Sequence, residues 1–273
     1  MTGGPVLLSE DRDGVRTLTL NRPERKNAIN LELWAALSDS LGAAGRDPDV
    51  RAVVLTGAGG AFSSGGDISA SSNGHPTHKM RALTDVALLL HELPKPTIAK
   101  VTGVAVGAGW NLALGCDFVV ATPESKFSQI FARRGLSLDL GGSWLLPKLV
   151  GLQQAKRLAL LAEMIDAAEA RALNLVTWVV AAEDIDSYVA ELAERLVAGP
   201  PVALAQSKAL LNEGADRTMR DALANEARAQ MVNFATADAS EAYAAFAAKR
   251  EPLFTGRWAV QRAGSSAGVR NDE

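Results

Sequence analysis

Apolar and polar positions follow two different periods in the first part of the chain. Residues 15–20 alternate one by one, which predicts a strand with one buried face, whereas residues 50–56 form a continuous apolar run typical of a buried parallel strand. Between them, apolar side chains recur at helical spacing over residues 31–44, and Asn30 precedes this segment as a candidate N-cap. Strands that alternate with helices predict a parallel sheet with right-handed crossovers.

A strand–turn–helix–strand unit follows, and we expect the rest of the chain to be organised around it. A β-rich run over residues 97–106 leads into Gly107-Ala108-Gly109, then into a short apolar helix over 110–116 and a strand over 117–121. The first amides of a helix have no partner within it and carry the positive end of its dipole. This unit is therefore suited to stabilise developing negative charge.

The remainder of the chain is predicted to be mostly helical. Before residue 184 we expect helices over residues 79–93, 144–162 and 166–173, followed by a strand over residues 176–180. After it, helical patterns follow one another without a strand, over 184–198, 201–212, 218–236 and 239–250. We therefore expect a core over residues 1–198, an alanine-rich helical subdomain over 199–258, and a polar tail without fixed structure over 259–273.

Composition narrows the class of protein. The chain has 273 residues, 48% hydrophobic and 22% charged, with a net charge of −3, which is ordinary for a globular protein and argues against nucleic-acid binding. No apolar run approaches the roughly 20 residues that span a bilayer, and the N-terminus lacks the pattern of a secretory signal. A single cysteine, Cys116, fits a reducing compartment, and His75, His78 and His91 show no metal-ligand spacing. We expect a cytoplasmic protein without metal, nucleic-acid or membrane partners.

Two glycine-rich loops are the candidate site. Residues 107–113 lack the third small residue of a dinucleotide fingerprint, and no loop has the lysine–serine pair of a phosphate-binding loop. Residues 64–67 and 107–109 each follow a predicted parallel strand, so both loops are expected at the same edge of the sheet. One amide from each could hold one oxygen as an oxyanion hole, which suits an enolate or a tetrahedral intermediate. The alternative is that these glycines only form turns.

Four segments, taken together, resemble the motifs of the crotonase (enoyl-CoA hydratase/isomerase) superfamily in order and spacing. They are Asn21-Arg-Pro-Glu-Arg-Lys-Asn-Ala-Ile29, Gly60-Ala-Phe-Ser-Ser-Gly-Gly-Asp-Ile68, residues 95–109, and Lys249-Arg-Glu-Pro-Leu-Phe254. The resemblance runs from about Val6 to Trp258. It implies an α/β fold, a spiral of ββα units with a helical C-terminal trimerisation subdomain, and a homotrimer or a hexamer of paired trimers. It also implies an acyl-CoA thioester substrate and no separate cofactor, since coenzyme A is part of the substrate.

The resemblance also assigns site residues. It gives the oxyanion amides to Gly66 and Ala108. It places the coenzyme A path along Lys26, Ala28, Ser64, Gly65, Gly66, Asp67 and Ile68. Lys249 and Phe254 fall where a C-terminal segment, sometimes from a neighbouring subunit, contacts coenzyme A; the alternative for Lys249 is a solvated helix end.

The acid and base groups decide the expected reaction. Hydratases of the superfamily use two glutamates, and the motifs align these with Asn111 and Phe131, neither of which can ionise. Asp139 stands where hydratases carry glycine and where Asp-dependent enoyl-CoA isomerases resembling this chain carry an aspartate. One carboxylate can move a proton between C2 and C4 once the enolate is stabilised, and apolar neighbours would raise its pKa. Alternatively, Asp139 caps the helix near Ser143 or pairs with Arg133 or Arg134.

We therefore expect an acyl-CoA enzyme that shifts a double bond, with Gly66 and Ala108 holding the enolate and Asp139 carrying the proton. Two alternatives stay open on the same fold. The protein could be a hydratase or a hydrolase- or dehalogenase-like enzyme that uses Asp139 to activate water or as a nucleophile. It could also be an acyl-CoA-binding protein without catalysis, since both hydratase glutamates are absent.

Overall fold

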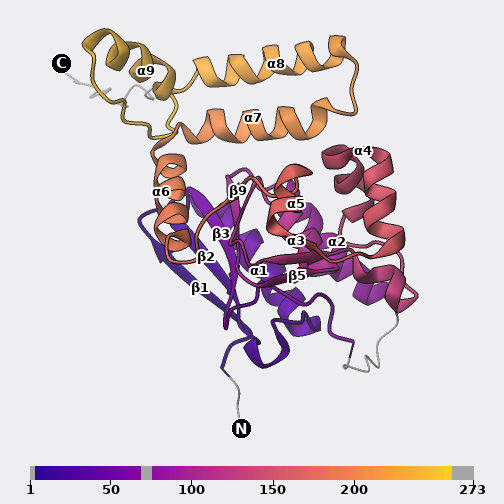
Figure 1. Cartoon of the computed structure of the whole chain (residues 1–273). Helices are drawn as coiled ribbons and strands as arrows, with labels where there is room; N and C mark the ends of the chain where they lie inside the picture. The colour runs from indigo at the N-terminus through magenta and orange to yellow at the C-terminus, as the bar shows by residue number, and fades with distance from the viewer. Residues whose placement is uncertain (1–3, 69–75, 260–273) are drawn as a thin grey trace, which may run out of the picture. The chain divides into compact units, whose positions relative to one another are not determined.

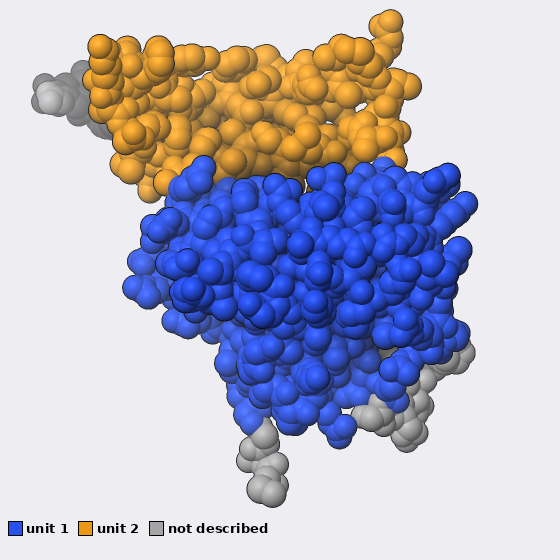
Figure 2. All heavy atoms as spheres, in the orientation of Figure 1, with its two compact units in different colours: residues 1–197 blue, residues 198–273 orange. Residues whose placement is uncertain are grey.

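The computed structural model describes residues 4–68 and 76–259, and the chain separates into two compact units, residues 1–197 and 198–273 (Figure 2). The first unit is built on a six-stranded sheet of order β1-β2-β3-β4-β6-β9 (Figure 1). Its strands are β1 Leu7–Arg12, β2 Val15–Leu20, β3 Ala52–Gly57, β4 Thr97–Val101, β6 Phe118–Ala121 and β9 Trp178–Val179. Apart from the antiparallel β1–β2 hairpin, neighbouring strands run parallel, as the alternation of strands and helices predicted.

The continuous apolar run of β3 is explained by burial on both faces of the sheet. Val53 and Leu55 belong to the main core, where they join the apolar face of helix α1. Val54 points to the other face and packs in a second cluster with Ile98 and with Val189 of α6 (Ile185–Ala198). Because each fully buried aliphatic side chain stabilises the fold by about 1.5–3 kcal/mol, both faces of the sheet contribute.

The predicted strand over residues 97–106 is wrong as a single element. β4 ends at Val101, and β5, Val104–Val106, belongs to a separate three-stranded sheet of order β5-β7-β8. The chain bends between them at Gly103, which has a φ of 64° and where an added Cβ would lie 2.1 Å from the carbonyl oxygen of Gly60. The other strands of this small sheet, β7 Lys126–Ser128 and β8 Ile165–Asp166, were not predicted.

Helices of the first unit begin close to the expected positions. Asn30 caps α1, Leu31–Arg46, by accepting a hydrogen bond from the amide of Leu33 at 3.0 Å, so the predicted cap is confirmed. The predicted helix over 144–162 is α4, Gly142–Leu161, which is interrupted at Gly151 (φ 74°, ψ 160°). The other helices of the unit are η1 Pro23–Arg25, α2 Pro76–His91, α3 Ala108–Leu114, η2 Ile130–Arg134 and α5 Ala167–Ala172.

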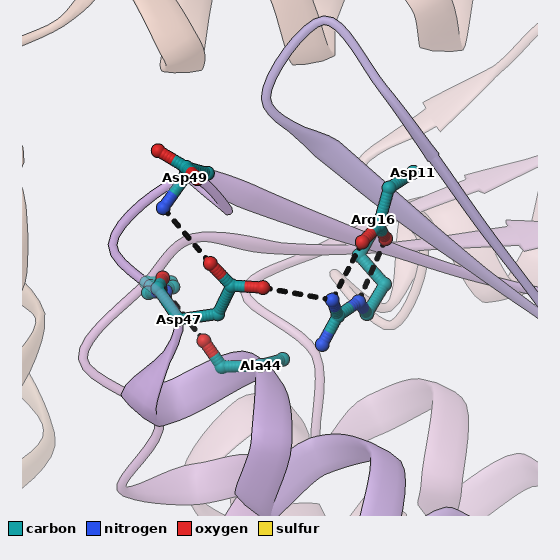
Figure 3. A network of polar contacts seen from close by, with 6 residues as sticks. Asp11, Arg16, Ala44, Asp47 and Asp49 are labelled. Atoms are coloured by element: carbon teal, nitrogen blue, oxygen red, sulfur yellow. Dashed lines mark hydrogen bonds and ion pairs between the residues drawn. The ribbon is translucent and has the colours of Figure 1, made fainter.

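A charged network joins the C-terminal end of α1 to the edge of the large sheet (Figure 3). Arg16 donates two hydrogen bonds to Asp11 (2.7 and 2.6 Å) and one to Asp47 (3.0 Å). The hydrogen bonds from Arg16 hold the pKa of Asp11 below its usual range. The ammonium of Lys95 donates to the carbonyl oxygens of Ala44 and Asp47, and its burial lowers the pKa of Lys95. The last carbonyls of α1 are thus satisfied by a cation, as a helix C-terminus favours.

The second unit is helical, with α7 Pro201–Gly214 and α8 Met219–Phe234 running antiparallel beside each other and α9 Ala237–Ala248 after them (Figure 1). The segment after α9 is held by two carboxylates: Asp238 accepts hydrogen bonds from the amides of Thr255 (2.7 Å) and Gly256 (2.9 Å), and Glu241 accepts one from Leu253 (2.9 Å). Large apolar side chains of this unit stay exposed, among them Leu211, Met219, Phe234, Phe246 and Leu253.

Two features of the sequence fall wholly or partly outside the described residues: the polar loop with His75, and the predicted tail beyond Ala259. Across the described helices, none has both the length and the apolar character to cross a bilayer. Over residues 4–68 and 76–259, no group of three or more histidine, cysteine, aspartate or glutamate side chains is arranged to hold a metal ion.

Candidate active site

The loop after β3 is held between two other segments of the chain. On one side Ser63 exchanges backbone hydrogen bonds with β5, donating to Val104 (3.0 Å) and accepting from Val106 (2.9 Å). On the other side Ile29 donates to Gly65 (2.8 Å) and accepts from Asp67 (3.0 Å). Residues 63–67 are therefore held from both sides by backbone hydrogen bonds, which fix the position of this loop.

The amides of Gly66 and Ala108 belong to two segments that lie close together. Ile29 and Gly66 form a parallel β-bridge, in which Ile29 bonds the carbonyl of Gly65 and the amide of Asp67, so the amide of Gly66 points away from Ile29. Ala108 is the first residue of α3, where an amide has no partner within the helix. Gly109 lets the two segments approach, because a Cβ there would lie 2.6 Å from Cβ and 2.9 Å from the carbonyl oxygen of Ser63.

A cleft of about 480 Å³ opens over these two amides. Its walls contain most of the residues that were predicted from the sequence, namely Lys26, Ala28, Ser64, Gly66, Asp67, Ile68, Ala108, Phe131 and Asp139. Gly65 of the same loop bonds Ile29, and Lys249 and Phe254 belong to the second unit. The predicted convergence of the two glycine-rich loops is confirmed.

Several residues that line the cleft were not predicted. Trp34 and Leu83 lie on the apolar faces of α1 and α2, and Met164 lies in the segment before β8. A helical stripe predicts that such residues face the interior, but it does not distinguish a core contact from the wall of a cleft. Arg134 also lines the cleft, together with Arg25.

Asp139 is a half-buried member of the cleft wall, between η2 and α4. Its carbonyl oxygen accepts the amide of Gly142 at 2.9 Å and closes a tight turn. The two central residues of this turn, Leu140 (φ 47°) and Gly141 (φ 77°), both have positive φ. The N-cap residue of α4 is Gly141, so Asp139 itself is not the N-cap of this helix.

The two positions aligned with the hydratase glutamates differ in their surroundings. Phe131 is buried and adds apolar surface to the cleft. Asn111 is buried in α3, where its Nδ2 donates to the carbonyl oxygen of Asp139 (2.9 Å) and its Oδ1 accepts from Nε2 of Gln129 (2.7 Å). Neither side chain offers an ionisable group to the cleft.

A second, largely apolar cavity of about 260 Å³ lies between α2, α3 and α4. Asn111, Leu140 and Gly141 form part of its wall, so the residues around Asp139 separate the two spaces. Trp144 lines the cavity in edge contact with His91, at 5.0 Å between ring centroids. No local pattern in the sequence predicted this cavity, which depends on the packing of three helices.

The two lysines assigned to coenzyme A share a backbone feature. Lys26 follows η1 with φ 49° and Lys249 follows α9 with φ 52°, so each ends a helix in the left-handed conformation. This conformation costs a non-glycine residue about 1 kcal/mol or more. Lys26 lies on the wall of the cleft.

Comparisons with known proteins agree along nearly the whole chain. A family model described as enoyl-CoA hydratase/isomerase matches residues 10–257. The chain is similar to a 1,2-epoxyphenylacetyl-CoA isomerase of Escherichia coli (39% identity over 259 residues, 92% of this chain and 98% of that protein). It is equally similar to a probable enoyl-CoA hydratase of Rhodobacter capsulatus (39% over 255 residues, 91% and 97%). Among solved structures, a putative enoyl-CoA hydratase from Streptomyces coelicolor A3(2) matches with a TM-score of 0.88 and 39% identity, covering 94% of this chain and 96% of that one.

Proposed function

This chain belongs to the enoyl-CoA hydratase/isomerase family and is an acyl-CoA enzyme, and from this premise we propose that it shifts a double bond within an enoyl-CoA thioester. The names of its relatives include both hydratase and isomerase, so the reaction is argued from the residues of the cleft. Asp139 carries the proposal. It shares the cleft wall with Gly66 and Ala108, while the positions of the hydratase glutamates hold Asn111 and Phe131.

The charges of the cleft support this choice of base. Among the described residues that line it, the acids are Asp67 and Asp139. The carboxylate of Asp67 forms an ion pair with Arg22, with Nη1 and Oδ2 2.8 Å apart. That ion pair fixes Asp67 in the loop that carries Gly66, and we assign proton transfer to Asp139.

The reaction follows from these roles. The thioester oxygen accepts hydrogen bonds from the amides of Gly66 and Ala108, each of which would be worth about 3–4 kcal/mol in the transition state. Asp139 removes a proton from C2 of a 3-enoyl thioester, and the electrons spread over an oxyanion and the C3–C4 double bond. The same carboxylic acid then returns the proton to C4, which gives the 2-enoyl thioester without change of mass.

Binding of the rest of the substrate is assigned to the loops around the cleft. Lys26, Ala28, Ser64, Gly65, Asp67 and Ile68 are assigned to the path of coenzyme A. Lys249 and Phe254 fall where the superfamily places a C-terminal segment, sometimes from a neighbouring subunit, that contacts coenzyme A. The exposed apolar side chains of α7–α9 would be covered in a homotrimer or hexamer. Coenzyme A enters as part of the substrate, so no separate cofactor takes part.

The decisive experiment incubates the enzyme separately with a 3-enoyl-CoA and a 2-enoyl-CoA and resolves the products by chromatography and mass. Conversion of the 3-enoyl ester at constant mass is expected. Asp139→Asn should lower this turnover at least about 100-fold while acyl-CoA affinity stays within a few-fold, and Asp39→Asn on the exposed side of α1 should change neither.

Each other product would contradict the proposal in its own way. Gain of water by the 2-enoyl ester as the main reaction would establish a hydratase. Release of free coenzyme A or halide would establish a hydrolase- or dehalogenase-like enzyme. Tight binding without any product would establish an acyl-CoA-binding protein.

A further inference from the structure

Asn111 makes a hydrogen-bonded brace with Gln129 behind the wall of the cleft. Its Nδ2 donates to the carbonyl oxygen of Asp139 at 2.9 Å, and its Oδ1 accepts from Nε2 of Gln129 at 2.7 Å. Asn111 is 1% exposed and Gln129 is fully buried. Both ends of the Asn111 amide are therefore engaged within the protein, and Gln129 decides which end faces Asp139.

The brace meets the backbone of Asp139 where that backbone is strained. The same carbonyl oxygen accepts the amide of Gly142, which closes the turn through Leu140. Leu140 is buried and has φ 47°, a conformation that costs a bulky residue about 1–3 kcal/mol and persists only where its surroundings impose it. A second hydrogen bond to the carbonyl of Asp139 is such a constraint.

The chain also leaves space for the brace. A Cβ at Gly142 would overlap the side-chain amide of Asn111, meeting its nitrogen, carbon and oxygen. Asn111 can therefore reach Asp139 only because position 142 carries no side chain. The turn, the glycine after it and the asparagine from α3 form one arrangement.

We propose that Asn111, oriented by Gln129, is a positioning residue that sets the backbone of Asp139 and so aims its carboxylate into the cleft. This inference rests on the proposed function of Asp139 as the base. A carboxylate at position 111 would have no proton to donate to the carbonyl of Asp139 and would add a second negative charge beside the base. An asparagine at position 111 therefore suits proton transfer by Asp139, whereas a glutamate at position 111 suits a different reaction.

The test is a double-mutant cycle with Asn111→Leu, which keeps the approximate size of the side chain and removes both hydrogen bonds. We expect kcat for the 3-enoyl ester to fall about 10- to 100-fold while acyl-CoA affinity stays within about threefold. In the Asp139→Asn background the same substitution should change kcat less than twofold, because Asn111 acts through Asp139. Ser128→Ala, which removes the buried hydrogen bond from Ser128 to the carbonyl of Ala162, controls for lost stability and should leave kcat unchanged.

Gln129→Met provides a milder variant if Asn111→Leu does not fold. It preserves the bond from Asn111 to Asp139 but removes the group that orients the amide, so kcat should fall about three- to tenfold with affinity retained. The positioning role is overturned if a folded variant keeps kcat within twofold of the wild type. It is also overturned if Asn111→Leu lowers kcat by the same factor in the wild-type background and in the Asp139→Asn background. If Asp139→Asn itself retains turnover, the proposed function fails instead, and the two failures are distinguished.

Discussion

Nη1 of Arg22 lies 2.8 Å from Oδ2 of Asp67, and the two side chains are only 15% and 6% exposed. The same guanidinium nitrogen donates to the carbonyl oxygen of Ala28. One arginine therefore connects the segment before α1 with the loop that carries Gly66, across 45 residues of chain. Removal of one partner from a buried ion pair leaves the other charge uncompensated, which typically costs 3–5 kcal/mol.

We expect Arg22→Met to lower the free energy of unfolding by about 3–5 kcal/mol. We also expect it to lower turnover, because the loop that carries Gly66 is displaced. Urea denaturation followed by circular dichroism measures the first effect, and the 3-enoyl-CoA assay measures the second. Arg12→Met is the matched control, because the ion pair of Arg12 with Asp13 is 84% exposed on both sides and should contribute less than about 0.5 kcal/mol. Equal effects of the two substitutions would show that the buried ion pair contributes no more to the free energy of unfolding than the exposed one.

Gly109→Ala tests the close approach of the two segments that carry Gly66 and Ala108, the proposed oxyanion amides. The added Cβ would lie 2.6 Å from Cβ of Ser63, so α3 and the loop must separate. We expect kcat to fall about 100- to 1,000-fold, because the two amides no longer converge on one oxygen, with a smaller change in acyl-CoA affinity.

The control for that substitution is Gly214→Ala at the end of α7, where an added Cβ meets no atom within 4 Å. Alanine is the better helix former, so this variant should be neutral or more stable by up to about 1 kcal/mol. Normal kcat in Gly109→Ala would show that the oxyanion site does not depend on this contact.

Acid should release the C-terminal segment from α9. The hydrogen bonds from Arg250, and then from the amide of Leu253, lower the pKa of Glu241 from its ordinary value of 4.5 to about 2. Because the folded-state pKa is depressed, the stability that Glu241 contributes is fully present above pH 4.5. It is lost as the pH falls from there towards 2.

Unfolding of the wild type and of Glu241→Gln, compared between pH 7 and pH 3, checks this prediction. The difference between them should be constant down to about pH 4.5 and then shrink. Glu251→Gln, on the exposed segment after α9, should follow the wild type throughout. A difference that grows at low pH would have the wrong sign for a depressed pKa.

Local sequence patterns predicted the helices and strands whose formation depends mainly on their own residues. The alternation of β2, the apolar run of β3 and the cap at Asn30 each report on contacts made by their own residues. β1 was not predicted because five of its six residues are exposed, and β8 because it has two residues. The break at Gly103 depends on the carbonyl of Gly60, more than forty residues earlier, so no pattern within residues 97–106 indicates it.

In the candidate site, too, some features could be predicted from the sequence and others depend on contacts between distant residues. The rule that the carboxyl ends of parallel strands share an edge predicted that residues 64–67 and 107–109 lie together, although the strand before Gly107 is β5 of the small sheet. The choice of Gly66 and Ala108 within these loops came from the resemblance to the superfamily. The hydrogen bond from Asn111 to Asp139 was beyond that reasoning. It joins residues 28 apart and depends on the side-chain space that Gly142 leaves empty.

Lys26 and Lys249 end their helices in a backbone conformation that suits glycine best. A variant library sorted only for heat tolerance would therefore enrich glycine at both positions. The same round of sorting would remove the two cations assigned to coenzyme A, so the survivors would tolerate heat and bind the substrate poorly. Directed evolution of this protein should select for thioester capture and for heat tolerance at the same time.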